Sequence, residues 1–366
     1  MKKTLLALSV AAFATTANAA VIYNNTDTGS RITFDGSVRL QLEKDYQKRT
    51  DLKDTGSRIT VRGEQDIGNG LTALGNIEFR FTDSEIGDSV KAKRLYAGFK
   101  HADVGTLTFG KQLTTGDAVG LSDYTYELGT TKSIDDAGNK VIHFISKNLL
   151  NSDKANFQLG GDYLFGEADR SKQQDNNGGW VVGAFYDQQF DNGLGFKTEA
   201  GYSEGRKVDT NGKYTHKSKA FRAAAELSYA GAAIAFDFFD RHSNNDQYTI
   251  SWRALPASSS NSGVEATRFH KVREYAIGAK YQLVEQSKIY GGYTWGKAHY
   301  AYDATNNTNS VSGKAVKMSK FTLGADYQIN KNLVTYLEGA RIVYKGDILG
   351  EARKDHKLQL GMRVFF

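Results

Sequence analysis

The sequence of 366 residues contains no cysteine and a single proline. The lack of cysteine excludes thiol catalysis, a disulfide framework and cysteine-ligated zinc. A mean hydropathy of −0.50 excludes a bundle of transmembrane helices, which needs several apolar runs of about 18 or more residues. A membrane β-barrel stays possible, because its strands are apolar on one face only. Against these absences stand 20 Tyr, 20 Phe and 38 Gly, a composition that favours β-structure.

The N-terminal segment has the pattern of a secretory signal peptide. Two lysines precede an apolar run from Leu5 to Ala14, and Ala17-Asn18-Ala19 forms a small-x-small cleavage site. We expect residues 1–19 to be removed, which lowers the formal charge from +6 to +4, and residues 20–366 to form one domain. A modest net charge with both signs interspersed gives no case for nucleic-acid binding.

The mature chain alternates apolar and polar residues with a period of two. In residues 31–43, RITFDGSVRLQLE, Ile32 and Phe34 share one parity, and Asp35 and Arg39 share the other. Successive side chains of a strand point to opposite faces, so this strand has one apolar and one charged side. No segment shows a long apolar stripe of helical period. The same alternation recurs in residues 71–82, 155–165, 218–229, 268–283, 316–329 and 355–366.

Short turns of Gly and Asn alternate with long polar stretches along the chain, as in a meander of hairpins within an outer-membrane barrel. The pattern predicts sixteen antiparallel strands in an all-β transmembrane barrel, although the weaker segments 105–111, 140–148 and 333–345 leave fourteen or eighteen open. A soluble β-sandwich or propeller is the alternative, but strands of 11–14 residues exceed the usual length of about 5–6. The expected strands are 31–43, 56–66, 71–82, 92–101, 105–111, 140–148, 155–165, 179–190, 194–203, 218–229, 232–242, 268–283, 288–299, 316–329, 333–345 and 355–366.

Several stretches resemble the general diffusion porins of Gram-negative outer membranes, and in particular the major porins of the Pasteurellaceae. They are AVIYNN at the mature start, SRITVRGEQDIGNGL, and KRLYAGFKHADVGTLTFGKQ, and the chain ends with GMRVFF. The resemblance implies a barrel in the outer membrane, assembled as a homotrimer, with a third loop that folds inward. It also implies that the barrel assembly machinery recognises the terminal Phe366.

The resemblance assigns pore-facing acids to the long segment after residue 111. Asp123, Glu127 and Gly129 in DYTYELG fall on the family's Asp-x-x-x-Glu-x-Gly spacing, and Asp117 is a further acidic candidate. The family usually has proline before the Glu, where this chain has Tyr126. The alternative for these acids is that they are ordinary solvated loop charges.

The opposing wall is expected to be basic. Arg58 aligns with the family's pore arginine on the second strand, and Lys111 stands where the family has an arginine, at a site that needs a bulge near Gly110. Lysine keeps the charge but loses the planar fork of donors. The complete set of expected basic wall residues is Arg39, Arg58, Arg62, Arg80, Arg94, Lys111 and Lys140.

Opposed acids and bases across a water-filled gap predict passive diffusion of ions and small hydrophilic solutes. A substrate-specific channel or a non-conducting adhesin barrel is the alternative. No nucleophile elbow or phosphate loop is present, so we expect neither an enzyme nor a bound cofactor or metal.

Apart from lipid and solutes, a second copy of the chain is the expected partner, through the outward Gly36, Gly63, Ala73 and Gly75. Aromatic belts at the two membrane interfaces are expected from Tyr96, Phe99, Trp180, Tyr186, Tyr202, Tyr229, Tyr281, Tyr293, Trp295 and Tyr327.

Overall fold

The computed structural model describes residues 19–45, 48–82, 86, 89–129, 134–150, 152–166, 168, 178–208, 214–245, 269–301, 314–346 and 352–366. The expected signal peptide therefore lies, apart from Ala19, outside the described residues. The strands are β1 (Ala20–Asn25), β2 (Ser30–Asp45), β3 (Asp51–Asp54), β4 (Arg58–Gly68), β5 (Leu71–Thr82), β6 (Ser89–His101), β7 (Gly105–Leu113), β8 (Ala137–Ser146), β9 (Ala155–Leu164), β10 (Gly179–Gln189), β11 (Gly195–Val208), β12 (Tyr214–Tyr229), β13 (Ala232–Ser243), β14 (Phe269–Val284), β15 (Ser287–Tyr300), β16 (Ala315–Asn330), β17 (Leu333–Gly346) and β18 (Arg353–Phe365).

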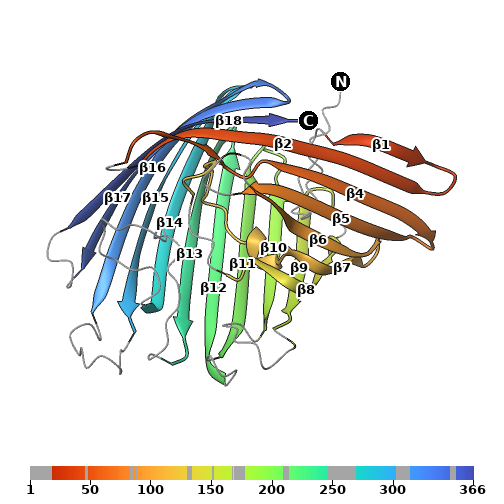
Figure 1. Ribbon diagram of the computed structural model, residues 1–366, viewed down its shortest axis with the longest axis horizontal. Helices are drawn as coiled ribbons and strands as arrows, with labels where there is room; N and C mark the ends of the chain where they lie inside the picture. The colour runs from red at the N-terminus through yellow and green to blue at the C-terminus, as the bar shows by residue number, and fades with distance from the viewer. Residues whose placement is uncertain are drawn as a thin grey trace.

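These eighteen segments occupy sixteen positions in a closed antiparallel barrel, which confirms the predicted number (Figure 1). On one edge of β2, β1 pairs with residues 30–34 and β18 with residues 37–45. On the other edge, β4 pairs with residues 30–37 and β3 with residues 40–43. Closure is completed by paired backbone hydrogen bonds between Gly36 and Phe366, of 2.8 and 3.1 Å. The three weaker predicted strands are present as β7, β8 and β17.

The burial of apolar and polar side chains is the reverse of that in a soluble protein, and this favours the membrane barrel over the soluble β-sandwich. Apolar residues of the predicted parity, such as Leu42, Leu323 and Leu360, are exposed, whereas polar residues of the other parity, such as Glu78 and Glu338, are buried. An apolar face that is exposed all around a closed sheet suits contact with lipid, and its polar inner face suits contact with water. Tyr96 is an exception to the expected aromatic belt, because it pairs with Gly110 and the buried Asn76 on the inner parity.

The only helix among the described residues is α1 (Thr115–Ala118), a single turn. No helix in the described part of the chain is both long and apolar enough to cross a membrane.

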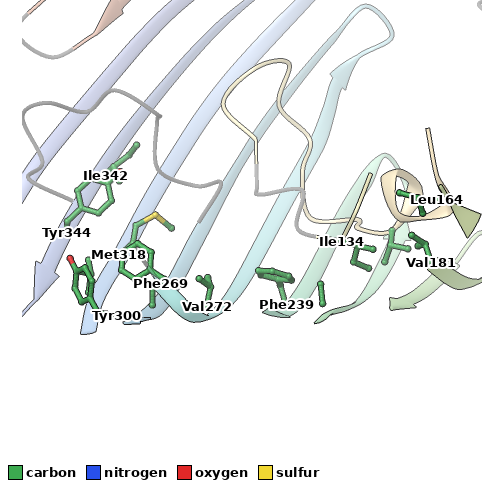
Figure 2. Close-up of a cluster of buried hydrophobic side chains, with 14 of the residues drawn as sticks. Ile134, Leu164, Val181, Phe239, Phe269, Val272, Tyr300, Met318, Ile342 and Tyr344 are labelled. Carbon is green, nitrogen blue, oxygen red and sulfur yellow. The ribbon is translucent and has the colours of Figure 1, made fainter. Parts of the chain in front are cut away.

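The inner face is not polar along its whole length. At the ends of β14–β17 where the long loops lie, inward side chains form an apolar cluster with almost no exposed surface (Figure 2). The inner face at this end is therefore apolar, because these side chains pack on one another instead of meeting water. The cluster includes Phe269, Val272, Ala298, Tyr300, Val316, Met318, Ile342 and Tyr344.

Candidate functional site

The segment between β7 and β8 begins with a turn of helix held against the inner wall. Thr114 caps α1, its side-chain oxygen accepting from the Gly116 amide at 3.2 Å. The Thr115 amide donates to Asp162 of β9 at 2.8 Å, and His143 of β8 lies 2.6 Å from the same carboxylate. This polar contact begins a series that continues around the barrel.

Wall carboxylates accept the next backbone amides of the segment. The Gly120 amide donates to Glu199 of β11 at 2.8 Å. The amides of Leu121 and Ser122 both donate to Asp237 of β13, at 3.0 and 3.1 Å. Asp237 also pairs with Arg222 of β12, so its negative charge is balanced although it is buried.

Glu338 of β17 holds the far end of the segment. Its carboxylate accepts from the backbone amides of Tyr126, Glu127 (3.0 Å) and Leu128 (3.3 Å), and from the Tyr290 hydroxyl at 2.9 Å. Hydrogen bonds to an ionised acceptor are about twice as strong as neutral ones. With only 1% of its surface exposed, Glu338 acts as a buried anchor for three consecutive amides.

Wall cations bind the carbonyl oxygens of the same stretch. The Lys320 ammonium of β16 donates to the carbonyls of Leu128 (2.9 Å) and Gly129. Arg363 of β18 donates to the Tyr126 carbonyl at 2.9 Å and to the Glu127 carboxylate at 2.7 Å. Residues 114–129 thus contact inward side chains of strands from β9 to β18.

Tyr126, the residue that stands in place of the family's proline, fixes the segment by its ring. The ring stacks on Tyr336 with centroids 4.4 Å apart and planes 7° apart, and its hydroxyl donates to Asp326 at 2.7 Å. The Arg363 guanidinium lies 4.6 Å from the ring centroid. Burial, with the hydrogen bond to Asp326, raises the pKa of Tyr126 above its ordinary value, so the hydroxyl remains a donor at neutral pH.

Inward glycines make room for the segment, and sequence reasoning did not identify them. A Cβ on Gly160 or Gly183 would meet Thr115 at 2.6 Å, and one on Gly278 would meet the Ser122 carbonyl oxygen at 1.9 Å. A Cβ on Gly201 would lie 2.8 Å from Val119. The sequence did contain a signal for these glycines. They stand at inward positions of several strands, among polar residues, where a water-filled lumen would not require a small residue.

The three predicted acids occupy different surroundings. Asp117 lies in α1. Asp123 accepts from the amide and hydroxyl of Thr125, at 3.0 and 2.8 Å. A Cβ on Gly129 would lie 1.8 Å from an Asp123 carboxylate oxygen, which explains why glycine ends the Asp-x-x-x-Glu-x-Gly pattern here. Glu127 makes the ion pair with Arg363.

Four of the predicted wall arginines lie together, around a carboxylate that was not predicted to join them. Glu78 of β5 is 2.5 Å from Arg80, 2.7 Å from Arg94 of β6 and 3.8 Å from Arg58 of β4. Arg39 of β2 interacts electrostatically with Arg80 and Glu78. Arg62, in contrast, pairs with Asp35 and is neutralised there.

The two predicted lysines lie apart from this arginine cluster. Lys111 is opposite Leu95, an exposed outward side chain, and opposite residues of paired strands share a face. The expected irregularity is present beside it, between Gly110 and Gln112. Lys140 is exposed and alternates with the buried, inward-facing Val141. The register therefore places both lysines with the outward residues.

Glu127 links the segment to the arginine cluster. Its partner Arg363 is directly opposite Arg39, and Arg39 also interacts electrostatically with Glu127. Burial raises the pKa of Glu127 above its ordinary value, and Arg363 partly opposes this shift by stabilising the charged form. An acid of the segment therefore interacts directly with bases of the inner wall.

Comparison with known proteins agrees with this architecture. A family model described as Gram-negative porin matches residues 5–347. The major outer membrane protein of Pasteurella multocida is 37% identical over 388 aligned positions that cover all of both chains, and the corresponding protein of strain Pm70 is also 37% identical, over 392 positions.

Solved structures show the same fold at low sequence identity. OmpF of Salmonella typhi, in complex with daunomycin, superposes with a TM-score of 0.66 at 17% identity, covering 95% of this chain and all of the other. An anion-selective porin from Comamonas acidovorans gives a TM-score of 0.64 at 15% identity, covering 92% and 100%. OmpT of Vibrio cholerae in its trimer form gives 0.63 at 16% identity, covering 92% and 99%.

The closed barrel, the exposed apolar outer face and the full-length similarity to outer membrane proteins lead to one assignment. The chain belongs to the Gram-negative porin family and is a β-barrel protein of the outer membrane.

Proposed function

We propose that the protein is a general diffusion porin, a water-filled channel for ions and small hydrophilic solutes, constricted by residues 114–129. The observation that carries the proposal is the attachment of this segment: six of its backbone amides donate to Glu199, Asp237 and Glu338 of the inner wall. Such contacts hold a loop inside the barrel at a fixed position, as a constriction requires.

The proposed selectivity follows from charges of opposite sign on the two sides of the gap. Glu127 and Asp123 supply negative charge on the segment, and Arg39, Arg58, Arg80 and Arg94 supply positive charge on the wall. A transverse field of this kind orders water and favours polar solutes, while charged rings adjust ion preference. Transport needs no chemical step, so we infer that the protein is not an enzyme.

Reconstitution into a planar lipid bilayer tests the proposal. We expect a large, ohmic, weakly selective conductance. An absence of conductance from correctly folded protein would favour an adhesin barrel. Saturation of the current by one solute class would favour a substrate-specific channel, an alternative that the stacked tyrosines Tyr126 and Tyr336 do not support because they pack on each other.

The double variant D123N/E127Q is expected to shift ion selectivity towards anions. Both substitutions remove negative charge from the segment and keep the shape of the side chain. Glu127 interacts with Arg363 and Arg39, and Asp123 interacts electrostatically with Lys320. The measurement is the reversal potential under a salt gradient. The charge-matched control D103N/D191N changes two exposed carboxylates at the short-turn end. An unchanged potential in the first variant, or an equal shift in the control, would contradict the assignment of the loop acids.

Acidification is expected to reduce the cation preference of the channel at a higher pH than the protonation of an ordinary glutamate would. The pKa of Glu127 is raised by burial, so its carboxylate takes up a proton at a higher pH as the pH falls, and its negative charge is then lost. We expect the reversal potential to begin moving towards anions at a pH above the range in which an ordinary glutamate titrates. In the E127Q variant this component should be missing, and a titration identical to the wild type would contradict the role of Glu127.

Replacing an inward glycine should displace the segment without changing any charge. In G278A the new Cβ would lie 1.9 Å from the Ser122 carbonyl oxygen, a backbone atom, so the segment must move. Overpacking typically costs about 1–3 kcal/mol. We expect a changed single-channel conductance and greater current noise. In the control G339A no atom lies closer than 3.8 Å to the new methyl group, and its conductance should equal that of the wild type.

We also propose a homotrimer whose contact includes the outward face of β4 and β5. Gly63 and Gly75 lie opposite each other, and nothing lies within 4 Å of a Cβ on either, so this surface is low and open. Gly36 is instead covered by the ring of Phe366, 2.5 Å from its Cβ position. Cross-linking in mild detergent should give a trimer band, and a monomer alone would refute the proposal. Removal of residues 1–19 on export and recognition of Phe366 by the assembly machinery complete the proposed route to the membrane.

A further inference from the structure

A cavity of about 360 Å³ opens in the inner wall of the barrel, at the ends of β14–β18 where the short turns lie (the upper ends in Figure 1). The side chain of Tyr126 forms part of its lining, so the cavity adjoins the inward segment of residues 114–129. In outer-membrane barrels the short turns are periplasmic. The cavity therefore lies on the periplasmic side of the proposed constriction.

The charged side chains at this cavity largely neutralise each other. The Lys288 ammonium of β15 lies 3.5 Å from the Asp326 carboxylate of β16, and it lies 5.2 Å from the ring centroids of Tyr126 and Tyr290. Asp326 also accepts from the Lys288 amide at 3.0 Å and from the Tyr126 hydroxyl at 2.7 Å. Among the described residues that line the cavity, Glu285, exposed in the turn after β14, is the one charged side chain without an ion pair. An ionic ligand would therefore have to compete with an existing ion pair.

Three glutamine side chains supply the remaining hydrogen-bonding groups of the cavity. Gln282 of β14 donates its amide N–H to the turn carbonyls of Val284 and Glu285, at 2.9 and 3.3 Å, which leaves its oxygen as an acceptor. Gln286 and Gln328 are joined by a backbone hydrogen bond of 2.8 Å, and their side chains have no hydrogen-bond partner within the described part of the chain. An amide offers donors and an acceptor without charge. The cavity therefore presents uncharged hydrogen-bonding groups that no other protein group uses.

One side of the cavity is apolar. It is lined by Leu333 and Val334 of β17 and by Phe365 of β18, which lie together because Leu333 is opposite Val364 and the Phe365 amide donates to the Asn332 carbonyl at 2.7 Å. Small-molecule sites usually combine an apolar surface with a few polar groups that fix orientation, in a volume of about 300–1,000 Å³. This cavity is at the lower end of that range, so it suits a small solute.

We propose that the cavity is a binding site for a small neutral sugar. The hydroxyl groups of a sugar both donate and accept hydrogen bonds, as the free amides require, and its C–H groups can pack on the apolar side. A carboxylate or phosphate would instead meet Glu285 and a lysine that Asp326 already neutralises. We expect millimolar affinity, so the site retains a sugar briefly and does not exclude other solutes. Arrival of the sugar through the barrel rests on the proposed channel function, whereas binding at the site does not depend on conduction.

Saturation-transfer difference NMR on folded protein, in a detergent without a sugar headgroup, measures the binding of D-glucose. For Q286A/Q328A we expect the dissociation constant to rise about tenfold, the effect of losing two neutral hydrogen bonds. The anion D-gluconate should bind the wild type more weakly than D-glucose does. The matched control Q188A/Q189A removes two amides at the same end of the barrel, whose partners lie in β10 and the turn after it, and should bind D-glucose like the wild type.

Heat-dependent mobility in SDS gels verifies folding, and Q328A replaces the double variant if the latter does not fold. Wild-type affinity in the folded variant would overturn the site, and so would an equal loss in the control. Equal or tighter binding of D-gluconate would show an anion site and overturn the proposed class of solute. Protein that conducts ions but binds no D-glucose contradicts this inference alone, whereas protein that binds D-glucose without conducting contradicts only the proposed channel function.

Discussion

Replacing Glu338 with alanine should release the segment of residues 114–129 from the wall. The variant removes one acceptor from three consecutive amides, Tyr126 to Leu128, and from the Tyr290 hydroxyl. Hydrogen bonds to a charged group contribute roughly 1.5–3 kcal/mol each, so at the lower value the loss of the three amide bonds should weaken the docking of this stretch by about 4.5 kcal/mol. That change lowers the docked population relative to the undocked one by about a thousandfold.

Hydrogen–deuterium exchange of the three amides measures the effect directly, and the exchange of Gly120 to Ser122, held by other carboxylates, should change much less. Single-channel recordings should show a larger conductance with more open-channel noise. The matched control is E43A, which removes another buried inward carboxylate whose partners are Gln41, Lys53 and Gln359 and not the segment. Protection of residues 126–128 equal to that of the wild type would contradict the anchoring role of Glu338.

The barrel itself follows from local pattern. Alternation assigns each strand's faces without reference to any distant residue, as Leu360 and Arg363 of β18 illustrate, and the hairpin order then sets the neighbours. Strand number and most boundaries were therefore predictable from sequence. The interruption between β3 and β4 was not predictable from sequence. Both segments pair with one edge of β2, and this arrangement depends on how β18 and β1 close the barrel along its other edge.

The anchoring of the segment was not predictable in the same way. Glu338 has the parity of any hydrated lumen charge, and its amide partners are more than 200 residues away in sequence. For Lys111 and Lys140 the sequence did make an assignment, and the structure places them differently. A resemblance assigned them to the wall, but the pairing is irregular between Gly110 and Gln112, and a change of one residue in register moves a side chain to the other face.

The arginine cluster was predictable as a set of inward cations, but its central carboxylate was not. Arg58 is directly opposite Arg80, and Glu78 is opposite Arg94, so one acid serves cations on three strands. Because Glu78 has only 2% of its surface exposed, its charge is fully committed to these partners. This arrangement makes Glu78 the residue whose neutralisation has the largest expected effect on the wall.

The variant E78Q should destabilise the barrel and increase anion preference together. Glutamine keeps the shape of the side chain, but Arg58, Arg80 and Arg94 lose their shared negative partner. Breaking a buried ion pair by removing one charge typically costs about 3 kcal/mol or more. Urea unfolding in detergent should show the loss, and the reversal potential should shift towards anions because three guanidinium groups are no longer balanced.

The double variant E78Q/R80Q separates this electrostatic explanation from a packing defect. Removal of one unbalanced cation should recover part of the stability lost in E78Q, and it should return the reversal potential towards that of the wild type. The control E43Q neutralises a buried inward carboxylate with a single lysine partner, Lys53, and should cost less. If the double variant is as unstable as the sum of its two single variants, repulsion among the guanidinium groups is not what Glu78 relieves.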